Sequence, residues 1–171
     1  MTLVILIRGI HAALWLAAAY KWGDWKNWSK YYPTMLFMGM GDLIYNVVFY
    51  NKKLWSFNPG LINPIFSELF VIFTIFSCTV LVFLTYFPKT LMKQFQYVTL
   101  WVFIYIIIEI VLTRLGMQFN ESGWNIWWSV LHNFYQFPLL AIHYKKPYLA
   151  WALAITILII MMTIFEIPLI N

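Results

Sequence analysis

The sequence predicts an all-α protein, a single domain over residues 1–171 that forms a bundle of six transmembrane helices. Three observations lead to this prediction. Hydrophobic residues make up 63% of the chain and charged residues only 10%, whereas soluble domains are about 25% charged. The mean hydropathy is +0.77. The apolar residues are gathered into runs close to the length of about 20 residues that a helix needs to cross a bilayer.

The six apolar runs are separated by short segments that hold most of the charged residues. Because the fifth run is polar along one side, a bundle of five spans is the alternative, and it would move the C-terminus to the other side of the membrane. We expect the first run to stay as a permanent span, since no basic region precedes it and no clear cleavage site follows it. The runs cover roughly Leu3–Tyr20, Pro33–Tyr50, Asn63–Phe87, Phe95–Leu115, Gly123–Ile142 and Pro147–Ile167.

Prolines and candidate N-caps support these limits. Proline is tolerated at the first turn of a helix, and Pro33, Pro64 and Pro147 stand where runs begin. Pro88 and Pro168 follow the third and sixth runs and should end them, while Pro138 should kink the fifth. Asn63 and Ser122 have side chains that can cap a helix N-terminus.

Basic residues alternate between the two sides of the predicted bundle. Cytoplasmic loops of membrane proteins are enriched in lysine and arginine. We therefore expect a multi-pass protein of a bacterial cell membrane with three cytoplasmic loops and both termini outside. One side would carry Lys21, Lys26, Lys30, Lys89, Lys93, Lys145 and Lys146, and the other Lys52, Lys53 and Arg114.

The net charge of +5 indicates a membrane surface rather than nucleic acid as the partner. Between the first two runs, Lys21, Lys26 and Lys30 alternate with tryptophans, a pattern typical of the membrane interface. We expect these lysines to contact anionic lipids. A homodimer is also considered, because six helices are few for a carrier protein.

Several segments of this chain resemble a family of small multi-spanning membrane proteins from spore-forming Gram-positive bacteria. The segments are KWGDWKNW from Lys21, GDLIYN from Gly41, GWNIWWS from Gly123 and the Lys145-Lys146-Pro147 turn. The resemblance covers nearly the whole chain in similar order. It implies a compact helical membrane protein and supplies no catalytic residues.

Ionisable residues inside the predicted spans are the main functional signal. Burying such a group in lipid is costly, so it usually faces the bundle interior and serves a purpose. Asp42 lies near the middle of the second span, with Asn46 one turn away on the same face. Glu109 lies in the outer part of the fourth span, and Arg8 and His11 share a face of the first. Glu68 is expected at the start of the third span, where a helix N-terminus favours an acid.

The fifth span carries a continuous polar stripe at helical spacing. Its members are Asn125, Trp128, Ser129, His132, Asn133 and Gln136. With the expected topology, this stripe meets Asp42, Glu109 and the first span in the outer half of the bundle. An alternative for the stripe is that its members only hydrogen-bond neighbouring helices.

The two interior histidines leave the cofactor undetermined. His11 and His132 are expected at similar depths, so they are candidate ligands for haem iron or another transition metal. The sequence contains no phosphate-binding glycine loop and no motif of a hydrolase or zinc protease. The sole cysteine, Cys78, is most simply a packing residue.

These residues predict a polar pocket in the outer half of the bundle that binds or translocates a small polar molecule, cation or proton. Asp42 and Glu109 would carry charge, and Arg8 would balance it. Two alternatives remain at this point. One is an intramembrane metal or haem protein, or an enzyme, that uses the same residues. The other is a structural or accessory subunit without a ligand.

Overall fold

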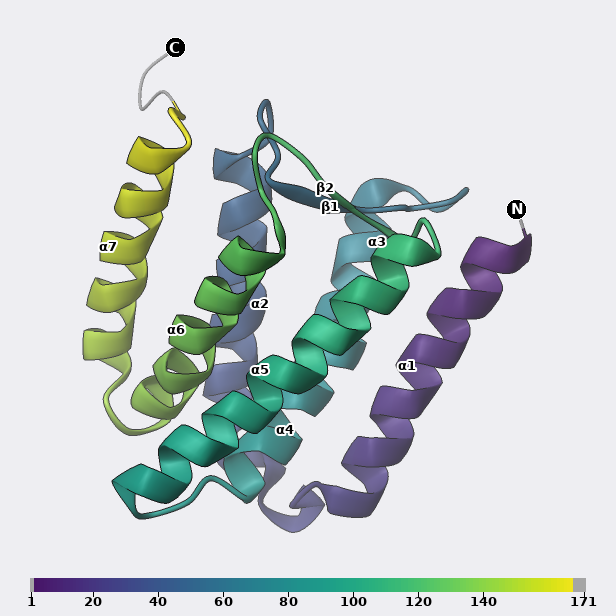
Figure 1. Cartoon of the computed structure of the whole chain (residues 1–171). Helices are drawn as coiled ribbons and strands as arrows, with labels where there is room; N and C mark the ends of the chain where they lie inside the picture. The colour runs from purple at the N-terminus through teal and green to yellow at the C-terminus, as the bar shows by residue number, and fades with distance from the viewer. Residues whose placement is uncertain (1, 168–171) are drawn as a thin grey trace.

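The computed structural model describes residues 2–167, and helices dominate this part of the chain (Figure 1). The all-α prediction is confirmed. Every predicted run is helical, and Pro168 lies outside the described residues. The long helices are α1 (Thr2–Trp22), α2 (Tyr32–Val48), α5 (Leu91–Arg114), α6 (Ile126–Lys145) and α7 (Pro147–Ile164). The third run forms one rod from α3 (Pro64–Val71), a π-helical turn (Ile72–Phe76) and α4 (Ser77–Thr85).

Four helical stretches are long and apolar enough to cross a membrane, which is consistent with a membrane location. They are Leu3–Trp22, Pro64–Thr85, Leu91–Arg114 and Pro147–Ile164. The other two helices differ from them in length or polarity, since α2 has only 17 residues and α6 carries the polar stripe. The count of six spans therefore stays a prediction.

Side-chain caps set where two of the helices begin. The Asn63 side chain accepts a hydrogen bond from the Ile65 amide at 2.9 Å, as its predicted capping role requires. The expected cap at Ser122 is wrong. Ser122 has a φ of 50°, and Asn125 caps α6 instead by accepting from the amides of Trp127 and Trp128. The helix therefore begins three residues later than the predicted run.

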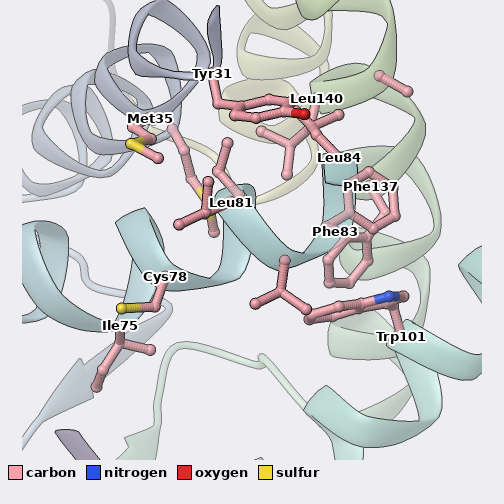
Figure 2. Close-up of a cluster of buried hydrophobic side chains, with 14 of the residues drawn as sticks. Tyr31, Met35, Ile75, Cys78, Leu81, Phe83, Leu84, Trp101, Phe137 and Leu140 are labelled. Carbon is pink, nitrogen blue, oxygen red and sulfur yellow. The ribbon is translucent and has the colours of Figure 1, made fainter. Parts of the chain in front are cut away.

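The rod that ends in α4 forms the centre of the bundle. Val80, Leu81 and Phe83 of α4 are fully buried, and α4 packs against both α1 and α2. Phe83 contacts Phe137 of α6 with ring centroids 5.1 Å apart, and Figure 2 shows this contact within the main cluster. The Trp101 ring of α5 also packs against the rings of Phe83 and Phe137.

The outer surfaces of the peripheral helices are apolar. Ala150 is the buried residue of α7, whereas large side chains such as Ile159, Ile160 and Ile164 are about half exposed. Large exposed apolar surfaces are unfavourable in water and are usually covered by another apolar surface. Lipid is the simplest cover for helices of this length.

The π-helical turn packs against α2. Its extra residue per turn is accommodated by Ser77, whose Oγ donates to the Ile72 carbonyl at 3.0 Å. Gly39 of α2 faces this turn, and a Cβ at that position would lie 2.5 Å from Ile72 Cγ2. Glycine is therefore required there by helix packing, because the Ile72 side chain fills the space beside it.

One end of the bundle carries a small sheet, which the sequence analysis did not predict. β1 (Trp55–Phe57) pairs antiparallel with β2 (Gln118–Asn120), so the loop after α2 is joined to the loop after α5. The sheet lies at the same end as the start of α1 and the end of α7 (Figure 1). The loops at the opposite end, which we call the lysine-rich end, hold exposed lysines such as Lys26, Lys89 and Lys146.

Tyr45 fastens this sheet to α2. Its hydroxyl donates to the Trp55 carbonyl at 2.8 Å and accepts from the amides of Leu54 and Trp55 at 2.9 and 2.8 Å. Its ring stacks on Trp55 with centroids 3.9 Å apart and planes within 1°. We refer to the segment of Leu54–Phe57 with Met117–Asn120 as the cap.

Candidate functional site

A cavity of about 300 Å³ lies inside the bundle beneath the cap. All six helical rods contribute to its wall, and Trp55 and Gln118 of the cap line it as well. Ligand pockets in proteins usually measure about 300–1,000 Å³, so this cavity can hold a small molecule.

Most residues expected in the pocket contribute to this wall. The cavity is lined by Arg8, His11, Asp42, Glu109, Ser129, His132, Asn133 and Gln136. Asn46 does not line the cavity but contacts Asp42, which does. Its Nδ2 donates to the Asp42 carbonyl at 3.1 Å and to Asp42 Oδ2 at 3.3 Å. Asn125 has the capping role described above, and it is not part of the wall.

Glu109 is buried at the centre of a hydrogen-bond network between α5, α6 and the cap. Its Oε1 accepts from Ser129 Oγ at 2.7 Å and from Asn120 Nδ2 at 3.0 Å. Ser129 in turn accepts from Trp124 Nε1 at 2.8 Å, and its carbonyl accepts from Asn133 Nδ2 at 2.8 Å. The network holds one carboxylate oxygen in a fixed position at the cavity wall.

Arg8 is directed toward protein acceptors at the side of the cavity. Its Nη1 donates to Ser67 Oγ, and its Nη2 donates to the Asn58 carbonyl at 2.5 Å. Its Nε is buried and has no hydrogen-bond partner. The sequence left open whether Arg8 pairs with an interior acid or extends to the interface. In the structure its hydrogen bonds go to a serine and a loop carbonyl.

Glu68 is a neighbour of this site that the sequence analysis assigned only to a helix N-terminus. It lies close enough to Arg8, Asp42 and Lys53 for their charges to interact. Its Oε2 is buried without a hydrogen-bond partner. Glu68 and Arg8 belong to different helices, so no pattern in the sequence places them side by side.

The two interior histidines line the cavity from opposite helices. Trp15 Nε1 donates to His11 Nε2 at 3.0 Å. His132 Nδ1 shares a hydrogen bond of 2.6 Å with the Tyr135 hydroxyl, which also reaches Met161 Sδ at 3.2 Å. Within residues 2–167, no three histidine, cysteine or acidic side chains are placed to hold a metal ion. The metal alternative therefore gains no support from a ligand cluster.

Aromatic rings make up much of the wall beneath the cap, which differs from the expected polar pocket. Trp55 lies at their centre, with ring centroids 3.9 Å from Tyr45, 4.7 Å from Trp124 and 5.2 Å from His132. We call Tyr45, Trp55, Trp124 and His132 the aromatic cluster. Sequence periodicity could not locate it, because Trp55 and Trp124 belong to short segments between the long helices, and these segments meet only in the folded chain.

The function therefore has to be inferred from the cavity itself, and the resemblance to small spore-former membrane proteins stays a prediction. No family model, no curated protein and no solved structure matches this chain.

Proposed function

We propose that this chain is a membrane protein that binds or translocates a small polar molecule, cation or proton by means of the cavity beneath the cap. One observation supports this proposal most directly. Ionisable side chains from four separate helices, Arg8, Asp42, Glu109 and His132, line a single cavity large enough for a ligand. Such groups are costly inside a bilayer and are usually retained for function.

The rival function, a structural subunit, rests on the pairing of the same side chains. The Glu109 network could serve only to hold the helices together, since Ser129 and Asn120 both donate hydrogen bonds to the same carboxylate oxygen. A purely structural interior would be packed and fully paired. The cavity, together with the unpartnered Arg8 Nε and Glu68 Oε2, favours a binding role.

The proposed membrane setting includes six spans, both chain termini outside and lipid contact at the lysine-rich end. Lys21, Lys26 and Lys30 are exposed there, which supports the expected attraction to anionic headgroups. A homodimer remains part of the proposal as a way for so small a bundle to transport its ligand.

Thiol labelling tests whether small solutes reach the cavity. Cys78 is first replaced by alanine, and Ile108→Cys then places a thiol in the cavity wall. Ile107→Cys is the matched control, because Ile107 is the adjacent residue of α5 and lies 45% exposed on the outer surface. The protein is reconstituted in liposomes and treated with a small, charged methanethiosulfonate reagent, added outside or trapped inside.

We expect the thiol of Ile108→Cys to react and that of Ile107→Cys, surrounded by lipid, to stay unmodified. Reaction from both sides of the membrane supports translocation, and reaction from one side supports binding without transport. If the folded Ile108→Cys protein reacts from neither side but does so after denaturation, the cavity is closed to solutes and the structural role is correct.

A further inference from the structure

We infer that the ligand of this cavity is an amphipathic organic cation, a positively charged group attached to a small apolar or aromatic body. This inference rests on the proposed function and adds the chemical class of the ligand. It is drawn from the relative positions of the carboxylates, the aromatic rings and Arg8 in the wall.

Both carboxylates of the wall adjoin the aromatic cluster. Asp42 lies three residues before Tyr45 on α2, so the two share a face, and the Tyr45 ring stacks on Trp55. Glu109 is joined to Trp124 through the Ser129 hydroxyl, by hydrogen bonds of 2.7 and 2.8 Å. A ligand in contact with the cluster therefore lies near both carboxylates.

Aromatic faces and carboxylates attract the same kind of group. The faces of tryptophan and tyrosine rings attract cations, most strongly where water is excluded. Carboxylates attract cations by charge. A cationic group beneath the cap would be stabilised by both, whereas an anion would be opposed by both.

Arg8 does not reverse this preference. Within residues 2–167 it is the one lysine or arginine that lines the cavity. Its terminal nitrogens donate to Ser67 and to the Asn58 carbonyl, so these donors are already directed at protein oxygens. An anionic ligand would have to displace those contacts to reach the terminal nitrogens, and the unpartnered Nε offers it a single N–H.

A bare metal ion does not fit the same wall. Hard cations such as Ca²⁺ require about six to eight oxygen ligands. No three acidic, histidine or cysteine side chains of residues 2–167 are grouped to bind one. The remaining wall is rich in rings such as Trp15, Tyr105 and Trp151, and these favour contact with an apolar body.

Equilibrium binding to the full chain in lipid nanodiscs tests the inference with three probes of similar shape. The probes are 1-methyl-4-phenylpyridinium as the cation, 4-phenylpyridine at pH 7.5 as the neutral molecule and 4-phenylbenzoate as the anion, with empty nanodiscs as the blank. We expect the cation to bind at least about tenfold more tightly than either of the others, because only the cation gains both attractions.

Two variants then test the carboxylates. Asp42→Asn and Glu109→Gln should each weaken binding of the cation by about tenfold or more while leaving the neutral probe little changed. Glu121→Gln is the matched control, because Glu121 is exposed and bonds to Ser56 outside the cavity. Circular dichroism confirms folding, and the comparison of probes on the unmodified protein stands even if a variant fails to fold.

The outcomes separate this inference from the proposed function. Equal binding of the neutral or anionic probe, no binding of the cation, or cation binding that survives both carboxylate changes would each overturn the organic-cation inference. The proposed function would still stand if the Ile108→Cys thiol reacts. An unreactive Ile108→Cys protein would instead remove the proposed function, whatever the probes do.

Discussion

Replacing Tyr45 by phenylalanine should loosen the cap without disturbing the ring packing beneath it. Tyr45 is 7% exposed, and its hydroxyl accepts from the amides of Leu54 and Trp55. Phenylalanine keeps the stack on Trp55 but leaves both amides without an acceptor. A buried donor left unpaired costs about 1–3 kcal/mol. With two donors affected, we expect a loss of at least about 2 kcal/mol in the free energy of unfolding.

The assay is thermal unfolding in nanodiscs combined with hydrogen exchange at the cap. For a chain of this length, about 1 kcal/mol shifts Tm by roughly 2–4 °C, so Tyr45→Phe should lower Tm by at least about 4–8 °C. The amides of Leu54 and Trp55 should also exchange faster. Tyr50→Phe is the control, because Tyr50 is 74% exposed. A Tm within about 1 °C of the unmodified protein, with the two amides still protected, would refute the role given to this hydroxyl.

Two further substitutions test the packing of α2. Gly39→Ala should destabilise the protein by about 1–3 kcal/mol, because its Cβ would clash with Ile72 and overpacking has that typical cost. In the control Gly41→Ala on the same helix, the added Cβ meets no atom within 4 Å. This change should leave stability unaltered or raise it by about 0.5–1 kcal/mol through helix propensity. Thermal unfolding compares the two variants, and equal Tm values would contradict the predicted difference. Thr34→Val removes the buried hydrogen bond of 3.0 Å to His143 Nδ1 and should cost about 1–3 kcal/mol, measured the same way, with an unchanged Tm as the contrary result.

The positions of the helices were predictable because each apolar run is long and its limits carry local signals. Asn63 followed by Pro64 marks the start of the third run, and the structure begins α3 there. The error at α6 has a local cause. Ser122 and Asn125 are both good N-cap residues, and the choice depends on Ser122 adopting a positive φ, which no pattern in the sequence reveals.

The polar wall of the cavity was partly predictable, and its aromatic part was not. Helical spacing places Ser129, His132 and Asn133 on neighbouring positions of one helix without any knowledge of the fold. Trp55 begins a three-residue strand and Trp124 lies in a loop, and segments this short have no periodicity from which to infer a direction. Their meeting depends on the β1–β2 pairing, in which Trp55 lies opposite Asn120.

Glu68 shows a different kind of error. Its position near a helix start has an ordinary explanation, since the positive end of the helix dipole stabilises an acid. The structure adds the nearby charges of Arg8 and Asp42, which belong to other helices. The helix-dipole rule explains the position of Glu68 from its own helix, but it gives no information about residues of other helices.

The pairing of β1 with β2 also restricts how the polypeptide can be threaded through a bilayer. Two hydrogen-bonded strands cannot lie on opposite faces of a membrane, so Trp55–Phe57 and Gln118–Asn120 share one face. The chain between them must then cross the bilayer an even number of times. Pro64–Thr85 and Leu91–Arg114 are both long and apolar enough to cross a membrane, so they would supply two crossings, one leaving that face and one returning to it. Glycosylation sites or protease tags inserted beside β1 and beside β2 should therefore report the same compartment.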